Sequence, residues 1–488
     1  MLGLVQSMKN HFAPINRVPP EVFPLILKHL DKRDMDKALT ALTHTCRSWR
    51  ELLVACPSLW TRLDCANVDR TRVYVERAKS SPLEVTLYWD RGTSHPEDAF
   101  LLVAPHVGRL QSLHIAGTRN LLENITQHIS CPVPLLREFT IDLTCEPAPV
   151  LKNTLFNRDL SSLRTLRLTG VVTYLPWKDL SKLTTFELGY VPEGKTTITR
   201  LLNFLVNAPH LTDVTFRNSI PTSSNAPPGR VVSLSHLKSL TILARPTHSI
   251  LLNHLSIPAG ASLVQEFNFS GVESPLPAYL PNTVQNLKNL CDVTSVNLYF
   301  DPAEKYVRLA GPSGGLYIFG RWEDNVEATP PPILDRRILR SLDYFPLNMT
   351  RRLAIRKYEP PPHGPVNKSS PFHIFYQMVN LRTLTLTRCN TLSFIIALDP
   401  DQNHSKRLLC PKLEELVLFV ESQDAFNIPE LMRMAMGRAS RDAKLSSITI
   451  IGLGELASRK EVFKLREHVT RVDYRVEEEP PEWDDIAN

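Results

Sequence analysis

Glycine is scarce in this sequence, whereas proline is abundant. The 488 residues include 18 glycines and 39 prolines, while an average chain has about 7% glycine and about 5% proline. Phosphate-binding loops depend on backbone conformations that glycine adopts most easily, so this composition disfavours functions built on such loops. Long uninterrupted helices are also disfavoured, because an interior proline removes a hydrogen bond and clashes with the preceding turn.

Several other patterns are missing. Residues 1–10 have no apolar core long enough for a secretory signal, and no segment approaches the roughly 18 apolar residues of a membrane span. The eight cysteines form no C-x-x-C pair and no zinc-binding spacing with histidine. We therefore expect reduced thiols, no metal or other cofactor, no membrane partner, and a cytoplasmic or nuclear location.

Charge of one sign is only slightly in excess. The 56 basic and 50 acidic residues give a net charge of +6, and the basic residues are scattered. This charge pattern is too weak to indicate a nucleic-acid partner. The apolar and charged fractions, 43% and 22%, are close to globular averages, so most of the chain is expected to fold. Its length allows two to four domains or one long repeat array.

The clearest pattern lies in residues 15–64. Val18-Pro19-Pro20-Glu21 is typical of a helix start, because proline and an acidic residue are both favourable in the first turn. Two further apolar-periodic segments follow before Leu59-Trp60, and the helical face of the first segment carries Val22, Leu25, Ile26 and Leu30. The pattern predicts a bundle of three short helices. So small a bundle buries little surface and needs a partner, either the following domain or another protein.

This segment resembles an F-box. The family opens with an apolar residue, a proline and a glutamate, as in Val18-Pro19-Pro20-Glu21, and carries Cys-Arg-x-Trp-Arg, as in Cys46-Arg47-Ser48-Trp49-Arg50. The resemblance implies docking onto the Skp-type adaptor of a cullin ubiquitin ligase. The residues that it implies in or beside that interface are Val18, Pro19, Ile26, Leu30, Cys46 and Trp49. The alternative is that these side chains form the core of the bundle.

A second motif recurs after residue 65: an apolar residue, two residues, an apolar residue, one residue, an apolar residue. Its openings are 20 to 32 residues apart, with one gap of 88 residues, and stand at Leu110, Leu136, Leu163, Leu183, Leu211, Leu237, Val264, Val293, Leu381, Leu413 and Leu445. Polar positions between the apolar ones suit strands with one buried face, and residues 198–207 and 430–436 predict helical connectors. The array resembles degenerate leucine-rich repeats.

The expected fold class is therefore α/β: an N-terminal three-helix F-box followed by an irregular leucine-rich-repeat-like α/β solenoid. We expect an N-terminal tail at 1–14, the F-box at 15–64, the repeat array at 65–475 and an acidic tail at 476–488. An irregular insertion is expected at about 299–372, where the regular spacing of the motif is lost. Within it, Val307 to Phe319 predicts a hairpin whose turn lies at 311–315.

Two segments resemble catalytic motifs. Gly311-Pro-Ser-Gly-Gly315 matches G-x-S-x-G, but strand-like sequence on both sides favours a hairpin turn over a nucleophile elbow. Gly452-Leu-Gly-Glu-Leu-Ala457 resembles a dinucleotide fingerprint, but too few residues follow it to complete a Rossmann half. We therefore expect no enzymatic activity, with a nucleotide-binding enzyme as an alternative.

Together these features predict the substrate-recognition subunit of a cullin-type (SCF) ubiquitin ligase. In this interpretation the F-box binds the adaptor, the array binds a target protein, and the chain acts by proximity alone. Exposed strand positions are the candidate target contacts: Arg164, Arg167, Glu187, Lys238, Arg382, Glu414 and Glu415. Each of these could instead be a solvated surface residue. For the whole chain, the first alternative is a repeat scaffold without ligase association, whose bundle only caps the array.

Overall fold

The computed structural model comprises two compact units, residues 1–196 and 197–488. It describes residues 14, 19, 22–30, 32–89, 96–144, 147–151, 155–158, 160–174, 180–192, 194–221, 227–243, 246–269, 284–301, 304–312, 314–322, 339, 342–357, 370–403, 406–420, 427–452 and 462–476. Within those ranges, no helix combines the length and the apolar character that a bilayer crossing needs. The domain boundaries expected from the sequence stay a prediction.

The first unit begins with three short helices, α2 (Val22–Lys28), α3 (Lys32–Thr43) and α4 (Arg47–Val54), followed by a 3-10 turn at Pro57–Leu59. The core of this bundle is apolar and consists of Leu27, Met35, Leu39, Leu53 and Leu59, each at most 3% exposed. The three helices predicted from apolar periodicity are therefore present.

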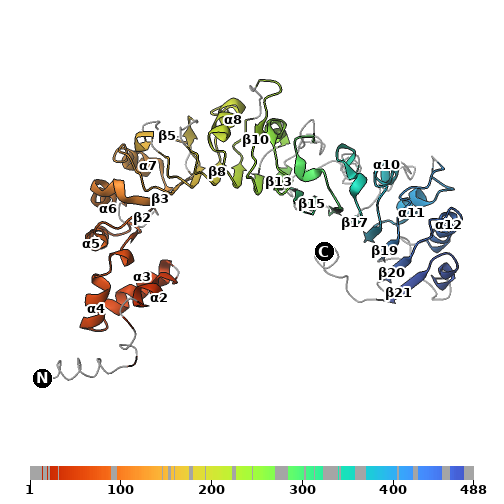
Figure 1. Cartoon of the computed structure of the whole chain (residues 1–488), viewed down its shortest axis with the longest axis horizontal. Helices are drawn as coiled ribbons and strands as arrows, with labels where there is room; N and C mark the ends of the chain where they lie inside the picture. Colours follow the sequence, from red (N-terminus) through yellow and green to blue (C-terminus); the bar gives the residue numbers. More distant parts are fainter. Residues whose placement is uncertain are drawn as a thin grey trace. The chain divides into compact units, whose positions relative to one another are not determined.

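The bundle continues directly into a parallel sheet. Six strands pair each with the next along the chain: β1 (Arg62–Leu63), β2 (Leu83–Tyr88), β3 (Leu110–Gly117), β4 (Glu138–Leu143), β6 (Thr165–Thr169) and β8 (Thr185–Gly189). Helices α5 (Val68–Ala78), α6 (Pro96–Val103) and α7 (Arg119–Thr126) lie on one side of these strands (Figure 1). A two-stranded parallel pair, β5 (Val150–Leu151) with β7 (Val172–Thr173), lies outside this sheet.

The apolar residues of the repeated motif form the core of this sheet. Leu113, Phe139, Leu166 and Phe186 stand opposite one another in register, and all four are fully buried. Side chains alternate between the two faces of a strand, so the polar residues between them lie on the other face. The alternation predicted from the motif is thus present in each of these strands.

The second unit repeats this architecture. After α8 (Ile198–Asn207) come the parallel strands β9 (Asp213–Arg217), β11 (Ser239–Leu243) and β13 (Ser262–Phe269), beside the short pair β10 (Val232–Ser233) and β12 (Leu255–Ser256). Its later part is the parallel series β17 (Arg352–Arg356), β18 (Thr383–Thr387), β19 (Glu415–Val420), β20 (Ser447–Gly452) and β21 (Arg471–Val476). Helices α10 (Ser370–Gln377), α11 (Leu392–Leu398) and α12 (Ile428–Ala439) lie on one side of that series (Figure 1).

Side-chain caps explain where several helices begin. The Asn67 Oδ1 atom accepts the backbone N–H of Arg70 at 2.9 Å at the start of α5. Asn427 accepts that of Glu430 at 3.1 Å at the start of α12. Such caps satisfy N–H groups that have no partner inside the helix, so these boundaries are encoded locally. The connectors predicted at 198–207 and 430–436 are the helices α8 and α12.

The second sheet contains an antiparallel insertion. Strands β14 (Ser295–Phe300), β15 (Glu304–Ala310) and β16 (Gly315–Trp322) pair antiparallel in sequence. The last of them, β16, pairs parallel with β13, while β14 pairs parallel with β17. The strand order is therefore β13-β16-β15-β14-β17. The hairpin predicted from the 311–315 turn is confirmed, and it stands between two strands that the repeat pattern would have made neighbours.

One motif position was wrong in register. The spacing pattern takes Val264 as the opening residue of a repeat, but β11 and β13 pair Leu240 with Leu263 and Thr241 with Val264. Leu263 is fully buried and Val264 is partly exposed. In the register of the sheet, Leu263 and Gln265 take the places of Leu240 and Ile242, whereas the motif assigns these places to Phe267 and Phe269, four residues further on. The position equivalent to the opening Leu237 is Gly260, so the sequence has no apolar opening residue there. Strands β1 and β2 at the start of the first unit and β21 at the end of the second, for which no motif is predicted, extend the parallel strands of their units.

Candidate protein-interaction site

The first helix of the bundle presents apolar side chains to solvent. Leu25 is 56% exposed, Ile26 52% and Leu30, just beyond the helix end, 36%, whereas Leu27 is only 3% exposed. Successive helical residues point about 100° apart, so Leu25, Ile26 and Leu27 cannot all face the same core. The bundle buries Leu27 and leaves its neighbours outside. Such an exposed apolar cluster on a small bundle is typical of an interaction surface.

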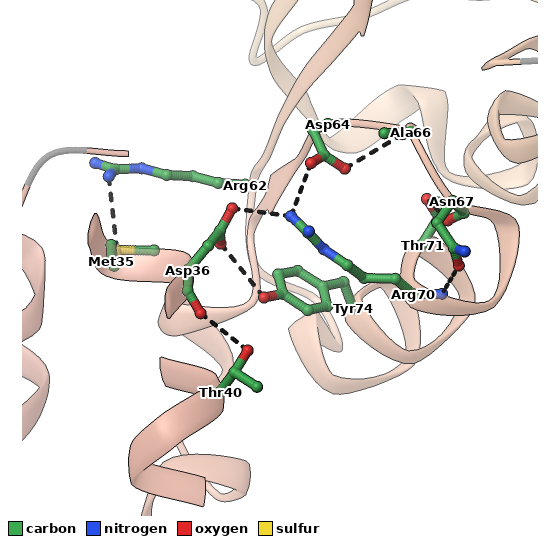
Figure 2. A network of polar contacts seen from close by, with 10 residues as sticks. All are labelled: Met35, Asp36, Thr40, Arg62, Asp64, Ala66, Asn67, Arg70, Thr71 and Tyr74. Carbon is green, nitrogen blue, oxygen red and sulfur yellow. Dashed lines mark hydrogen bonds and ion pairs between the residues drawn. The ribbon is translucent and has the colours of Figure 1, made fainter. Parts of the chain in front are cut away.

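A polar network joins the bundle to the first helix of the sheet region (Figure 2). The Arg70 guanidinium on α5 lies between two carboxylates, with its Nη2 atom 2.9 Å from Asp36 Oδ2 on α3 and 2.8 Å from Asp64 Oδ2 beyond β1. The Tyr74 hydroxyl donates to Asp36 Oδ1 at 3.3 Å. One guanidinium therefore connects α3, the segment after β1 and α5.

An aromatic contact reinforces the same junction. Trp60 is buried, its indole N–H donates to the Leu53 carbonyl at 2.9 Å, and its ring meets Tyr74 edge-on with centroids 5.0 Å apart. The Arg77 guanidinium lies 4.3 Å from the Trp60 ring centroid. Burial, followed by the charge of Asp36, raises the pKa of Tyr74 to about 12, so its hydroxyl is protonated and able to donate at neutral pH.

Removing the Arg70 guanidinium should weaken this junction by a modest amount. Arg70 and both carboxylates are partly exposed, so solvent screens the pair. We expect Arg70→Met to cost about 1 kcal/mol, measured as a lower thermal midpoint of the full chain. The loss should shrink at high salt, because ions screen exposed charges.

A matched control is Arg72→Met on the same helix, since among the described residues Arg72 forms an ion pair only with Asp69, at i,i+3, and both are well exposed. That change should be close to neutral. Equal losses for Arg70→Met and Arg72→Met would contradict a fastening role for Arg70.

Comparison with protein families matches this part of the chain. Residues 15–66 fit the family model described as F-box-like. The N-terminal bundle is an F-box-like domain. Comparison with curated protein sequences gives no significant match. F-box domains typically bind Skp-type adaptors, and the matched range includes α2 with its exposed apolar cluster as well as Trp60.

The F-box-like domain places the predicted adaptor contacts on different elements. Pro19 is exposed and precedes α2, and Ile26 and Leu30 are in the exposed apolar cluster. Cys46 and Trp49 are half-buried at the start of α4, where Cys46 is the N-cap residue in an extended conformation. Val18 lies outside the described residues. The role of all six in adaptor binding stays a prediction.

Sequence reasoning missed two features of the F-box-like domain. Leu25 is the most exposed member of the apolar cluster, and three apolar residues in succession on a short helix were the signal that one side had to be exposed. The contact between Asp36 and Arg70 joins residues 34 positions apart. No pattern in the sequence points to it, because charged residues at such separations are common on any surface.

The predicted target contacts lie on strands or directly before them: Arg167, Glu187 and Glu415 are in strands, and Arg164, Lys238, Arg382 and Glu414 each precede one. In the first unit Arg164 is exposed just before β6, and Arg167 pairs with Glu187 on the neighbouring strand at 3.6 Å. In the second unit Lys238 is exposed just before β11. Arg382 and Glu414 form a 3.5 Å ion pair, and the Thr383 hydroxyl donates to Glu415 at 3.2 Å. Their role in target binding also stays a prediction.

The structure describes most of the first catalytic-looking motif but only the first residue of the second. Gly311 and Gly315 flank the tight turn between β15 and β16, where a Cβ at Gly315 would lie 2.2 Å from the Leu309 carbonyl oxygen. Glycine is therefore required there by close backbone approach. Gly452 ends β20, and residues 453–457, the rest of the nucleotide-like motif, lie outside the described residues.

Proposed function

We propose that this chain is the substrate-recognition subunit of a cullin-type ubiquitin ligase. The F-box-like domain would bind the Skp-type adaptor and, through it, the cullin, while the sheet region would bind a target protein. The observation that carries the proposal is the apolar cluster of Leu25, Ile26 and Leu30, exposed on a domain that matches the F-box-like family model. Burial of such side chains in an interface would be favourable by about 25 cal/mol per Å².

We infer that the sheet region is a leucine-rich-repeat-like solenoid. Support comes from the successive parallel strands of each unit and from the unit that begins at Leu381. Its Cys389 is buried, and its thiol donates to the carbonyls of Ile355 and Thr387 at 3.3 Å. Leucine-rich repeats place an asparagine or cysteine at this position, where a side-chain donor satisfies backbone carbonyls inside the turn. A solenoid offers its strand face as one extended binding surface.

The proposed mechanism is proximity. Holding a target protein near the charged ubiquitin carrier raises the effective concentration of a target lysine, so this chain would need no catalytic residue, cofactor or nucleotide of its own. A cytoplasmic or nuclear location, without membrane association, follows from the same role, because the adaptor and the cullin would have to be available.

The test is co-purification of the full chain with the Skp-type adaptor. We expect the wild type to retain the adaptor and Ile26→Asp to lose most of it, because a charge buried in an apolar interface is costly. The matched control is Leu135→Asp, which places the same charge on an exposed leucine outside the F-box-like domain. Both substituted side chains are exposed, so neither variant should lose its fold.

Failure of the wild type to retain the adaptor, or equal retention by Ile26→Asp, would refute the ligase role and favour a repeat scaffold. If adaptor capture fails and NAD or ATP raises the thermal midpoint of the chain, the nucleotide-binding alternative is favoured instead.

A further inference from the structure

The antiparallel insertion of the second unit carries a cluster of aromatic side chains on the sheet face opposite its core. On β14, β15 and β16 the buried residues include Leu298, Val307 and Ile318, which stand opposite one another in register. The alternate positions carry the partly exposed side chains of Tyr299, Tyr306, Tyr317 and Phe319. We name these four residues the aromatic surface.

The rings of the aromatic surface contact one another. Tyr299 and Tyr306 are stacked with centroids 5.0 Å apart and planes 18° apart. Tyr317 and Phe319 are stacked at 6.2 Å and 11°, and Tyr306 links the two pairs through a 5.7 Å contact with Tyr317. Tyr299, Tyr306 and Phe319 also stand opposite one another across the three strands. The aromatic surface is thus one continuous patch.

Cations border this patch. Arg308 on β15 is exposed, stands between Asn297 and Tyr317 in register, and makes no ion pair with any described residue. The Arg356 guanidinium and the Lys357 ammonium each lie 5.7 Å from the Tyr299 ring centroid. The border also contains acids: Asp301 pairs with Lys357 and accepts from the Tyr299 hydroxyl, and Glu266 is the register partner of Phe319.

One row of outward positions in the first unit carries small or polar side chains. The residues of this row, which are in register with one another, are Thr86, His114, Thr140, Arg167 and Glu187. Tyr88 on β2 is an exposed outward ring, but the segment that interrupts the repeat order carries four rings in mutual contact. Tyrosine and arginine are the residue types that most often dominate binding energy in interfaces, and aromatic rings supply large contact area with a polar end.

We propose that the aromatic surface, with Arg308, Arg356 and Lys357, binds a short acidic peptide segment of a target protein. Guanidinium groups bind carboxylates through charge-assisted hydrogen bonds, and the rings would bind the apolar residues between them. The inference names the site and the chemistry of the target in the proposed receptor role and rests on that role. Its test is nevertheless independent, because peptide binding needs neither adaptor nor cullin.

A nucleic acid is the less suitable occupant. Its phosphates demand an extended basic stripe, whereas the three cations lie at separate points of a patch that also has Asp301 and Glu266 beside it. The tyrosine rings stack on one another, which leaves fewer free faces for bases. Because Lys357 already pairs with Asp301, Arg308 and Arg356 instead match a segment that carries two carboxylates.

The experiment measures binding of a fluorescein-labelled peptide of Glu and Asp residues around one Trp to the full chain, by fluorescence anisotropy. The control ligands are the same peptide with Gln and Asn in place of the acids, and a single-stranded oligouridine. We expect the acidic peptide to bind, with affinity falling as salt rises, and the neutral peptide and the oligouridine to bind far more weakly.

Substitutions at single residues test whether the peptide binds at the aromatic surface. Arg308→Glu and Tyr306→Ser should each weaken peptide binding about tenfold, because arginine and tyrosine are the residue types that most often dominate interface energy. Arg308→Lys should retain most of the affinity, because the charge remains. The matched control, Lys444→Glu, makes a similar charge change at an exposed residue before β20 and should leave binding unchanged. Thermal unfolding of each variant verifies that it is folded.

Absence of peptide binding, equal binding of the neutral peptide, or equal losses for Arg308→Glu and Lys444→Glu would overturn the proposal. Tighter binding of the oligouridine would also overturn it, in favour of a nucleic-acid surface. None of these outcomes depends on adaptor capture, so a failure here is distinct from a failure of the proposed ligase role.

Discussion

Replacing Trp60 with alanine should destabilise the first unit more than any other single change to the F-box-like domain. Trp60 is only 3% exposed, packs edge-on against Tyr74, and donates to the Leu53 carbonyl. Loss of a buried tryptophan side chain typically costs about 3–5 kcal/mol, because apolar contacts vanish and a cavity remains. The Leu53 carbonyl would also lose the indole donor, although it keeps the backbone N–H of Cys56.

The measurement is thermal unfolding together with amide hydrogen exchange across residues 47–78, which include α4 and α5. We expect a lower first transition and faster exchange in both helices, since Trp60 lies between them. The matched control is Tyr88→Ala, which removes an aromatic side chain that is 61% exposed on β2 of the same unit. If both variants lose the same stability, Trp60 does not hold the junction.

Replacing Arg438 with methionine should have a comparable effect on the second unit. Arg438 lies on α12, is fully buried, and donates from Nη1 to the Leu409 carbonyl at 2.9 Å and from Nη2 to the Cys410 carbonyl at 2.8 Å. Burial lowers its pKa to about 10, so the side chain still carries its charge at neutral pH. Methionine would fill much of the volume, but the Leu409 carbonyl would lose this donor, at a cost of about 1–3 kcal/mol. The Cys410 carbonyl would keep the backbone N–H of Leu413 as a donor.

Cys410 provides a local readout of this change. Burial raises the pKa of its thiol to about 12, and at pH 8 it is both protonated and covered. In Arg438→Met we expect thiol reagents to label Cys410 much faster, because the segment around residues 409–410 loses its support. The control is Arg433→Met on the same helix, where the arginine is about half exposed and pairs with Glu430. Unchanged labelling in Arg438→Met would contradict the expectation that Arg438 holds the segment around residues 409–410 in place.

The titration of the same thiol sets the direction in which the stability of the second unit changes with pH. Its folded pKa is raised above the ordinary value of 9.0, so its contribution to stability is complete below pH 9. The contribution is lost as pH rises from 9 toward 12, because the unfolded chain then releases a proton that the folded chain keeps. Arg438 contributes with the opposite sign above pH 10, because its folded pKa of about 10 lies below its ordinary value. The net loss of stability in the second unit should therefore be measured between pH 9 and 10.

Much of the local structure could be predicted from the sequence. Apolar residues at helical spacing predicted the three helices of the bundle, and alternating apolar and polar residues predicted strands such as β6 and β8. The turn glycines between β15 and β16 predicted the hairpin. These features depend on residues that are close in sequence, and they follow from side-chain periodicity and backbone sterics.

The candidate site was predictable only in part. The family resemblance located the F-box-like domain and pointed to Ile26 and Leu30. It did not identify Leu25 as exposed, and it gave no sign of the junction between Asp36, Asp64 and Arg70. Such a junction depends on where α5 packs against α3, which is decided by burial of apolar surface over the whole first unit.

Residue patterns alone were sufficient to predict the kinds of element, their approximate order and the family of the N-terminal domain. The three-dimensional structure was needed to show which side of α2 is buried, that Leu263 rather than Val264 faces the core, and that β15 and β16 stand between β13 and β14. The physical reason is that periodicity is a local property. Strand order and register are instead chosen among alternatives with similar local energies by contacts between residues far apart in the chain.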